Sequence, residues 1–239
     1  MSADIKALLF DVFGTVVDWR EGIARDVAAF FQYHDITGDA HAFADAWRQR
    51  YQTSMEPIRR GKRPFTRLDV LHRENLIATF AQSGIDHDRF AAAEIDDLSH
   101  AWHRLDPWRD SVAGLARLSE YGIVAPLSNG NILLLTNMAK RAGLRWDCIL
   151  GAEVAQAYKP HPDAYLRTAD ILGLMPQQCL MVAAHNGDLL AARQTGMRTA
   201  FIPRPREHGP NQTTDLKPDE DWDYVGGDLI ALAGLLDRR

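Results

Sequence analysis

The stretch LLFDVFGT, residues 8–15, decides the fold of this chain, because its apolar run delivers one carboxylate, Asp11, into a Gly-Thr turn. A short apolar run that ends in small and polar residues predicts a buried strand of a parallel sheet. Phosphate chemistry on such a turn would use a second acid two residues after Asp11, but that residue is Phe13. The sequence therefore raises the question of what a lone aspartate does there.

Similar apolar runs recur along the chain and predict the other strands. They occupy residues 121–130, 146–153, 179–188 and 198–205. Helical patterns lie between several of them, as in SVAGLARLSE and PDAYLRTADILG. Buried strands alternating with helices predict an α/β fold with a Rossmann-like parallel sheet covered on both faces.

One block interrupts this alternation, since residues 19–105 show mainly helical periodicity. We therefore expect a core domain of residues 1–17 and 106–239 and an inserted helical cap domain of residues 18–105. The insertion follows the first strand, so the cap would lie over the carboxyl ends of the strands, where sheets of this kind bind ligands. The polar segment 204–223 is predicted to be a surface loop without evident chemistry.

Composition narrows the class of partner. The chain has 239 residues, 46% of them hydrophobic, and a formal net charge of -5 without a basic stripe, which argues against nucleic-acid binding. Cys148 and Cys179 lack metal-ligand spacing and are expected to be free thiols in a reducing compartment. No export signal or membrane segment is recognised at the N-terminus. We expect a cytoplasmic protein that acts on a small molecule.

Polar groups follow the predicted strands and should converge at one edge of the sheet. They are Asp11 with Thr15, Ser128 with Asn129, Lys159, and Asp188. A buried carboxylate beside a lysine is costly unless the two are paired, so an ion pair between Asp11 and Lys159 is expected. Each residue has an ordinary alternative, such as a turn position for Thr15 or a helix cap for Asp188. Their joint occurrence at successive strand ends favours a site.

These segments resemble a known family. The stretches DVFGT (11–15), LSNG (127–130), YKPHPDAY (158–165) and VAAHNGDLLAAR (182–193) are similar to the four motifs of the haloacid dehalogenase superfamily, and most closely to its 2-haloacid dehalogenase branch. Phosphatases of that superfamily carry a second aspartate in the first motif and bind Mg²⁺. The dehalogenase branch has an aromatic residue there, as Phe13 is here.

The resemblance implies hydrolysis of a small 2-haloacid through a covalent ester on Asp11, without metal or cofactor. A carboxylate is a competent nucleophile towards a carbon that bears a good leaving group. The implied catalytic residues are Asp11, Lys159, Asp188, Thr15 and Ser128. The implied substrate- and halide-binding residues are Phe13, Asn129, His185, Asn186 and Tyr165.

Some positions depart from the family pattern or have two explanations. Counting back from the matching Trp-Arg-Gln at residues 47–49 places Asp39 where the family's cap arginine is expected, so that arginine is predicted to be missing. Ala183 and His185 replace a serine and an asparagine, and Gly187 replaces an aromatic residue. His185 is either a base or hydrogen-bond donor, or a strand-end histidine bonded to backbone.

A basic residue of the insert is expected to replace the absent arginine. The candidates are Arg48, Arg50, Arg59, Arg60, Lys62 and Arg63. Tyr165 has either a catalytic role or a packing role on an amphipathic helix.

Two other functions remain open alongside the dehalogenase. The first is a Mg²⁺-dependent phosphatase for a small ester, which Phe13 argues against because metal and general acid both favour an oxygen ligand there. The second is a non-catalytic protein that binds a small carboxylate. A homodimer is a further expectation.

Overall fold

The computed structural model describes residues 4–237 and is built around a five-stranded sheet in the order β4-β1-β5-β6-β7, with every neighbouring pair parallel. The strands are β1 (Ala7–Phe10), β4 (Ile123–Pro126), β5 (Cys179–Ala183), β6 (Arg198–Phe201) and β7 (Tyr224–Val225). The predicted parallel α/β sheet is confirmed. Because β1 is central, the residues that follow it lie at the middle of the carboxyl edge.

The side chains of β1 alternate between two apolar layers, as the pleat of a strand requires. Leu8 and Phe10 pack into one buried cluster, while Ala7 and Leu9 pack into the other. All four are fully buried. This burial on both faces explains why the strand reads as a continuous apolar run.

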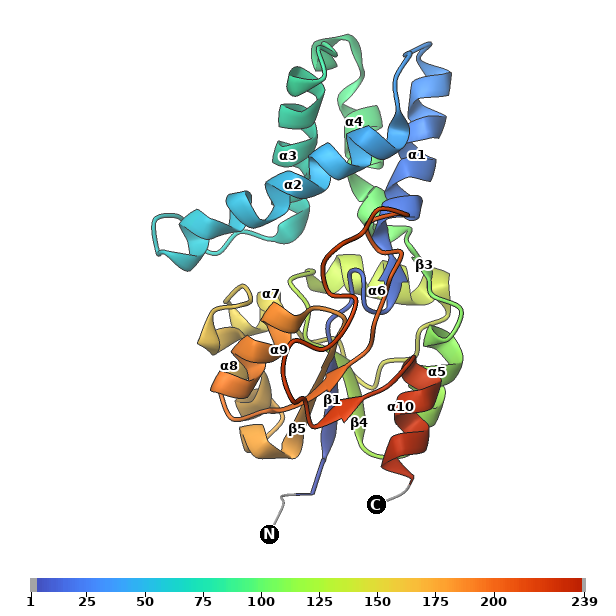
Figure 1. Cartoon of the computed structure of the whole chain (residues 1–239). Coiled ribbons are helices and arrows are strands. Elements are labelled where there is room, and N and C mark those ends of the chain that lie inside the picture. The colour runs from blue at the N-terminus through green and yellow to red at the C-terminus, as the bar shows by residue number, and fades with distance from the viewer. Residues whose placement is uncertain (1–3, 238–239) are drawn as a thin grey trace.

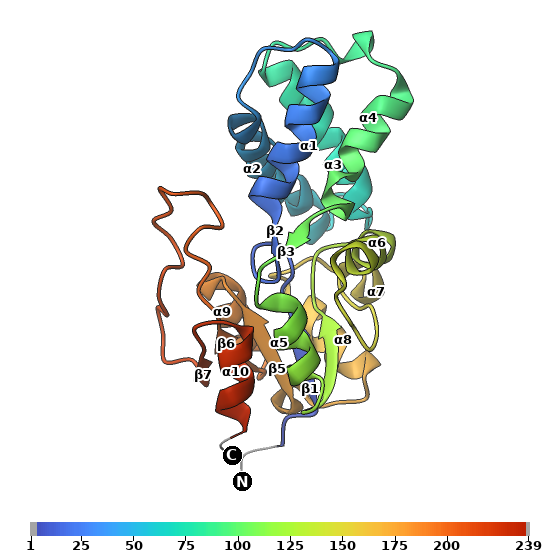
Figure 2. The same cartoon turned by 90° about the vertical axis from the view of Figure 1, so that its right-hand side faces the viewer.

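Helices cover both faces of the sheet (Figure 2). Helices α5 and α10 pack together on one face, and α8 and α9 lie on the other. The core helices are α5 (Ser111–Leu118), α6 (Ile132–Ala142), α7 (Ala152–Ala155), α8 (Pro162–Ile171), α9 (Asn186–Gln194) and α10 (Leu229–Leu236), with a 3-10 turn η3 (Pro176–Gln178).

A helical cap stands over the carboxyl edge of the sheet (Figure 1). It is joined to the core by two antiparallel strands, β2 (Val17–Asp18) and β3 (Asp106–Pro107). Its helices are α1 (Trp19–Tyr33), α2 (Ala40–Arg59), α3 (Leu68–Gln82) and α4 (Ala92–Ser99), with 3-10 turns η1 (His87–Arg89) and η2 (His100–His103).

Helix α2 forms one wall of the space between cap and core. Its buried residues include Ala44, Trp47, Tyr51 and Met55, which recur at helical spacing on one face. Arg48 lies between them on the side that faces the core. The helix therefore places one cation among the aromatic residues at the cap–core boundary.

Two sequence predictions, of a strand at 146–153 and of a surface loop at 204–223, need correction. The run at 146–153 is not a strand, because the carboxylate of Asp147 accepts a hydrogen bond from Val124 N (2.8 Å) and thereby caps the edge of β4. The segment 204–223 is a loop, as predicted, but it is tied into the core and supplies one cavity residue, Asp215, as described below. Within residues 4–237 no helix is both long and apolar enough to cross a membrane.

Candidate active site

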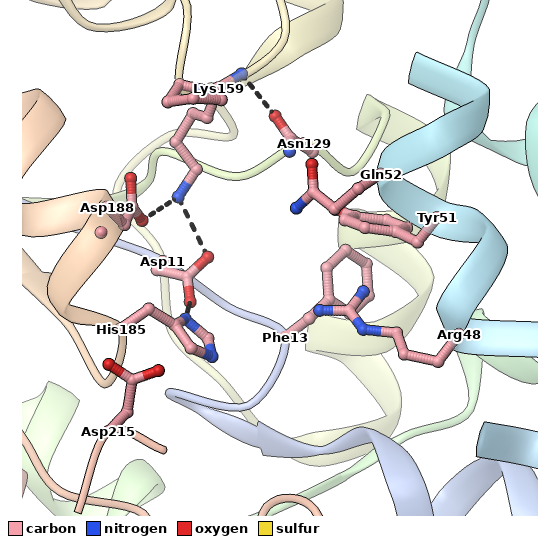
Figure 3. Close-up of a pocket in the computed structure, with 12 residues that line it drawn as sticks. Asp11, Phe13, Arg48, Tyr51, Gln52, Asn129, Lys159, His185, Asp188 and Asp215 are labelled. Atoms are coloured by element: carbon pink, nitrogen blue, oxygen red, sulfur yellow. Dashed lines mark hydrogen bonds and ion pairs between the residues drawn. The ribbon is translucent and has the colours of Figure 1, made fainter. Parts of the chain in front are cut away.

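Asp11 lies at the end of β1 and is held by donors on both carboxylate oxygens (Figure 3). Lys159 Nζ lies 3.0 Å from Oδ1, while Thr15 Oγ1 (2.8 Å) and His185 Nδ1 (3.0 Å) contact Oδ2. Burial alone would raise the pKa of Asp11, but the positive charges of Lys159 and His185 hold it far below its ordinary value. Asp11 is therefore a buried, ionised and fixed carboxylate.

Lys159 is shared between two carboxylates. Its Nζ also donates to Asp188, whose other oxygen accepts from the hydroxyl of Tyr165. Burial would lower the pKa of Lys159, but the charges of Asp11 and Asp188 raise it instead. Burial and the charge of Asp11 raise the pKa of Asp188. The expected pair between Asp11 and Lys159 is present, and Tyr165 contacts this cluster from α8 although it is also buried.

The remaining polar residues at the strand ends mostly hold loops in place. Thr15 accepts a hydrogen bond from Ala184 N (2.8 Å), which ties the first turn to the end of β5. The amide oxygen of Asn129 accepts from Lys159 N (2.8 Å), and Asn129 also lines the cavity. The Ser128 hydroxyl accepts from Gly130 N (3.1 Å), within its own turn.

His185 is bound between two acids. Its Nδ1 faces Asp11, and its Nε2 lies 3.0 Å and 2.9 Å from the two carboxylate oxygens of Glu207. Burial would lower the pKa of His185, but Glu207 and Asp11 raise it well above the ordinary histidine value. In this structure His185 therefore contacts side chains, which favours the base-or-donor interpretation over the strand-end one.

Glu207 is a site residue that sequence reasoning missed. It is 1% exposed and accepts a hydrogen bond from Trp19 Nε1 (3.0 Å). Gly14, at φ +88°, makes room for it, since a Cβ at Gly14 would collide with the Glu207 carboxylate. His185 lowers the pKa of Glu207 against the effect of burial. Glu207 thus supports His185 as a charged partner.

The loop 204–223 reaches the site because buried polar contacts anchor it. Arg204 makes two hydrogen bonds to Asp110 (2.7 and 2.8 Å) and a third to Thr15 O (2.9 Å). Asn186 binds this loop rather than facing the cavity: its Nδ2 donates to Asp215 (2.9 Å), and its Oδ1 accepts from Trp222 Nε1 (2.9 Å). The expectation that this loop lacks chemistry is wrong.

Arg48 supplies the cation on the cap side (Figure 3). Its guanidinium carbon lies 4.0 Å from the centre of the Tyr51 ring and 6.0 Å from that of Phe13. Its Nη1 is buried without a hydrogen-bond partner in the part of the chain that the structure describes. An unpaired buried donor of this kind is costly unless an anion or water meets it.

Four of the other five basic candidates of the cap have partners elsewhere, and Lys62 is exposed and is not among the cavity residues. Arg50 donates to Gln82, Arg59 and Arg60 contact Glu56, and Arg63 pairs with Glu74. Asp39 caps the start of α2, where it accepts from His41 N and Ala42 N. The position to which the family arginine was assigned is therefore a helix cap, and Arg48 of the Trp-Arg-Gln segment takes the place beside the cavity.

These groups enclose a cavity of about 410 Å³. Its lining consists of Asp11, Phe13, Arg48, Tyr51, Gln52, Asn129, Lys159, Pro160, His185, Gly187, Asp188 and Asp215. Asp11 faces Arg48 across it, and the Phe13 ring lies on the Arg48 side, where it adds an apolar surface (Figure 3). A small molecule with an anionic group and an apolar carbon centre fits this distribution of charge.

Residues 5–196 match the model of a family described as haloacid dehalogenase-like hydrolases. The solved structure of a defluorinating L-2-haloacid dehalogenase aligns with a TM-score of 0.96 at 54% identity, over 98% of this chain and 95% of that one. A second L-2-haloacid dehalogenase gives 0.93 at 41% identity, over 98% and 100% of the two chains. The (S)-2-haloacid dehalogenase of Xanthobacter autotrophicus is 28% identical over 202 residues, which are 84% of this chain and 76% of the relative.

Proposed function

Because this chain belongs to the haloacid dehalogenase-like hydrolases, we propose that it hydrolyses a small (S)-2-haloacid to the 2-hydroxy acid and a halide ion. The resemblance to the 2-haloacid dehalogenase branch is confirmed by these relatives. The observation that carries the proposal is the position of Asp11 opposite Arg48 in one cavity, with the Phe13 ring beside Arg48. In this arrangement C2 of a bound haloacid would have a nucleophile, a cation and an apolar surface around it.

In the first step an Asp11 oxygen forms a bond to C2 of the substrate. The carbon–halogen bond breaks, and its electron pair leaves with the halide, so that an aspartyl ester remains. The low pKa of Asp11 keeps the nucleophile ionised, and the bonds from Lys159 and Thr15 fix its direction. The backside geometry of this displacement inverts the configuration at C2.

Arg48 is the group best suited to bind an anion in this step. The substrate carboxylate and the departing halide both need donors once they leave water. Arg48 lines the cavity and has an unpaired donor, whereas Lys159 already serves Asp11 and Asp188. Fluoride, the poorest leaving group among the halides, needs such a donor most. The 54% identical relative is named a defluorinating dehalogenase, so we extend the proposal to fluorinated acids and choose fluoroacetate as the smallest of them.

In the second step water attacks the Asp11 carbonyl carbon and releases the hydroxy acid. Ester formation removes the carboxylate charge that helps to hold the proton on His185, so His185 can lose that proton to solvent. The neutral ring keeps the proton on Nε2, which donates it in a hydrogen bond to Glu207, and presents the free Nδ1 to the water as a base. The overall reaction then yields one halide ion and one proton for each water consumed.

Asp188 and Tyr165 act on this site through Lys159. Asp188 contacts Lys159 Nζ, and Tyr165 fixes Asp188 from α8. This arrangement supports positioning roles for both residues. Thr15 has a direct contact with the nucleophile, whereas Ser128 and Asn129 support the turn that follows β4.

The phosphatase alternative is disfavoured by the same contacts. Phe13 packs edge-on against Trp102, with ring centres 5.7 Å apart, and occupies the place of the second acid. The ammonium of Lys159 lies between Asp11 and Asp188, which are the two carboxylates that a cation would have to bridge.

An assay of halide release tests the function. The substrates are (S)- and (R)-2-chloropropionate, chloroacetate and fluoroacetate, each with and without EDTA, and Asp11→Asn is the inactive control. We expect release from the (S) isomer that EDTA does not reduce. Phosphate release from small esters that depends on added Mg²⁺ would support the phosphatase instead, and inertness in both assays would support a binding protein.

A further inference from the structure

The cavity has room beyond a three-carbon haloacid, and the free space lies on the side of Gly187. Cavities of roughly 300–1,000 Å³ hold drug-sized ligands, and this one measures about 410 Å³. Gly187 lines the cavity, and a Cβ built on it meets nothing within 4 Å. A substituent on C2 of the substrate therefore has open space next to the start of α9.

Asp215 borders this space and is held there. Its Oδ1 accepts hydrogen bonds from Asn186 N (2.8 Å) and Asn186 Nδ2 (2.9 Å). Figure 3 shows its carboxylate beside His185, on the opposite side of the cavity from Arg48. Both donors are uncharged, so neither of them compensates the charge of this carboxylate. The cavity is thus positive at the cap wall and negative at the wall formed by loop 204–223.

The other charged groups of the cavity largely compensate one another. Lys159 is shared by Asp11 and Asp188, and His185 lies between Asp11 and Glu207. Arg48 binds the carboxylate on C1 in the proposed reaction. A charge on the far end of the substrate therefore meets mainly the field of Asp215. A like charge there is repelled and an opposite charge is attracted.

We propose that Asp215 selects substrates by the charge of their C2 substituent, so that it disfavours 2-haloacids with a second carboxylate and favours those with a cationic or hydrogen-donating end. This inference rests on the proposed function and specifies its substrate class. Charge selection of this kind adds to binding and leaves the ester chemistry at Asp11 unchanged.

Three substrates of matched length test the proposal: the (S) isomers of 2-chloropentanoate, 2-chloroglutarate and 2-chloro-4-ammoniobutyrate. The measured quantity is the ratio of kcat/KM for the ammonium substrate to that for the glutarate. We expect the wild-type ratio to exceed ten. Asp215→Asn keeps an oxygen that can accept the hydrogen bonds of Asn186 and should lower the ratio about tenfold. A tenfold change corresponds to about 1.4 kcal/mol, the sum of the attraction of the ammonium and the repulsion of the second carboxylate, at about 0.7 kcal/mol each in a partly hydrated cavity.

Asp219→Asn is the matched control, because it removes the same charge from an exposed residue of the same loop that is not among the cavity residues. Its ratio should stay within about twofold of the wild type. Asp215→Ala should lower the ratio as Asp215→Asn does but also lower the Tm, because it loses the bond to Asn186 as well. A merely structural role for Asp215 would reduce all three rates together and leave the ratio unchanged.

A ratio in Asp215→Asn within about twofold of the wild type would overturn the inference. Rejection of all three long substrates by an enzyme that still dechlorinates (S)-2-chloropropionate would also overturn it, while the proposed function would stand. If (S)-2-chloropropionate itself yields no chloride, the proposed function fails.

Discussion

His185 Nε2 lies 2.9 Å from Glu207 Oε2, while Nδ1 of the same ring lies 3.0 Å from Asp11 Oδ2. One imidazole thus connects the nucleophile to a buried acid from the distant loop 204–223. The Asp11 charge is present before ester formation and absent after it. The same ring can therefore donate to the nucleophile in the first step and accept a proton in the second.

Glu207→Gln should slow hydrolysis of the ester more than its formation. The variant keeps a polar group beside His185 but removes the charge that supports the base, so we expect kcat to fall roughly 10²-fold. Intact-protein mass spectrometry of enzyme quenched during turnover should show the added mass of the ester. Glu220→Gln, an exposed change in the same loop, is the control. An unchanged kcat with no accumulated ester would contradict the proposed role.

The stability contribution of His185 should disappear at alkaline pH. Its pKa is raised in the folded state, so its ion pairs stabilise the protein fully below the unfolded value of about 6.5 and are lost as the pH rises through the folded pKa. The difference in Tm between wild type and His185→Gln should thus shrink as the pH is raised from 6 to 10. Calorimetry at several pH values measures this, and a constant difference would show that His185 is not charged in the folded protein.

Arg48→Gln should reduce kcat/KM by roughly 10²-fold or more, the loss expected for a buried charge-assisted contact of about 3 kcal/mol. Arg50→Gln is the matched control, because it lies on the same helix and donates to Gln82 instead. Steady-state kinetics on (S)-2-chloropropionate distinguishes the two variants. Near-wild-type kinetics in Arg48→Gln would show that another group binds the anion.

Arg204→Ala should destabilise the fold by about 3 kcal/mol, because it leaves Asp110 buried without its charged partner. Arg204 also binds Thr15 O, so the same change should loosen the loop that carries Glu207. Urea unfolding measures the free energy. A loss below about 1 kcal/mol would mean that this loop is held by its other contacts.

The sequence predicted the parts of the site that follow buried strands. Asp11 and Asp188 could be brought together because parallel strands place their carboxyl ends at one edge. Lys159 follows helix α7 and not a strand, so its place was predicted correctly only from the need of Asp11 for a charged partner and from the family resemblance. Glu207 and Asp215 could not be predicted, since they lie in a polar loop without periodicity, and only the contacts of Arg204 and Asn186 direct that loop to the site. The strand wrongly predicted at 146–153 also depends on a tertiary contact, because an apolar run does not reveal that the Asp147 side chain binds the edge strand β4.

Arg48 was one of six basic candidates, and its selection required the structure. Helical spacing puts it near Trp47 and Tyr51, but only the orientation of α2 over the core shows that this face borders the cavity. The neighbouring cations Arg59 and Arg60 are engaged with Glu56 on their own helix. Local sequence does not distinguish a basic residue without an acidic partner from one that forms an ion pair.

The covalent role of Asp11 is tested most directly by a single turnover in water enriched in heavy oxygen, with enzyme in excess over (S)-2-chloropropionate. The account predicts that the new hydroxyl of the first product carries ordinary oxygen from Asp11, and that the label appears in the Asp11 carboxylate on peptide mass analysis. Heavy oxygen in the product hydroxyl of that first turnover, with none in Asp11, would contradict the aspartyl ester.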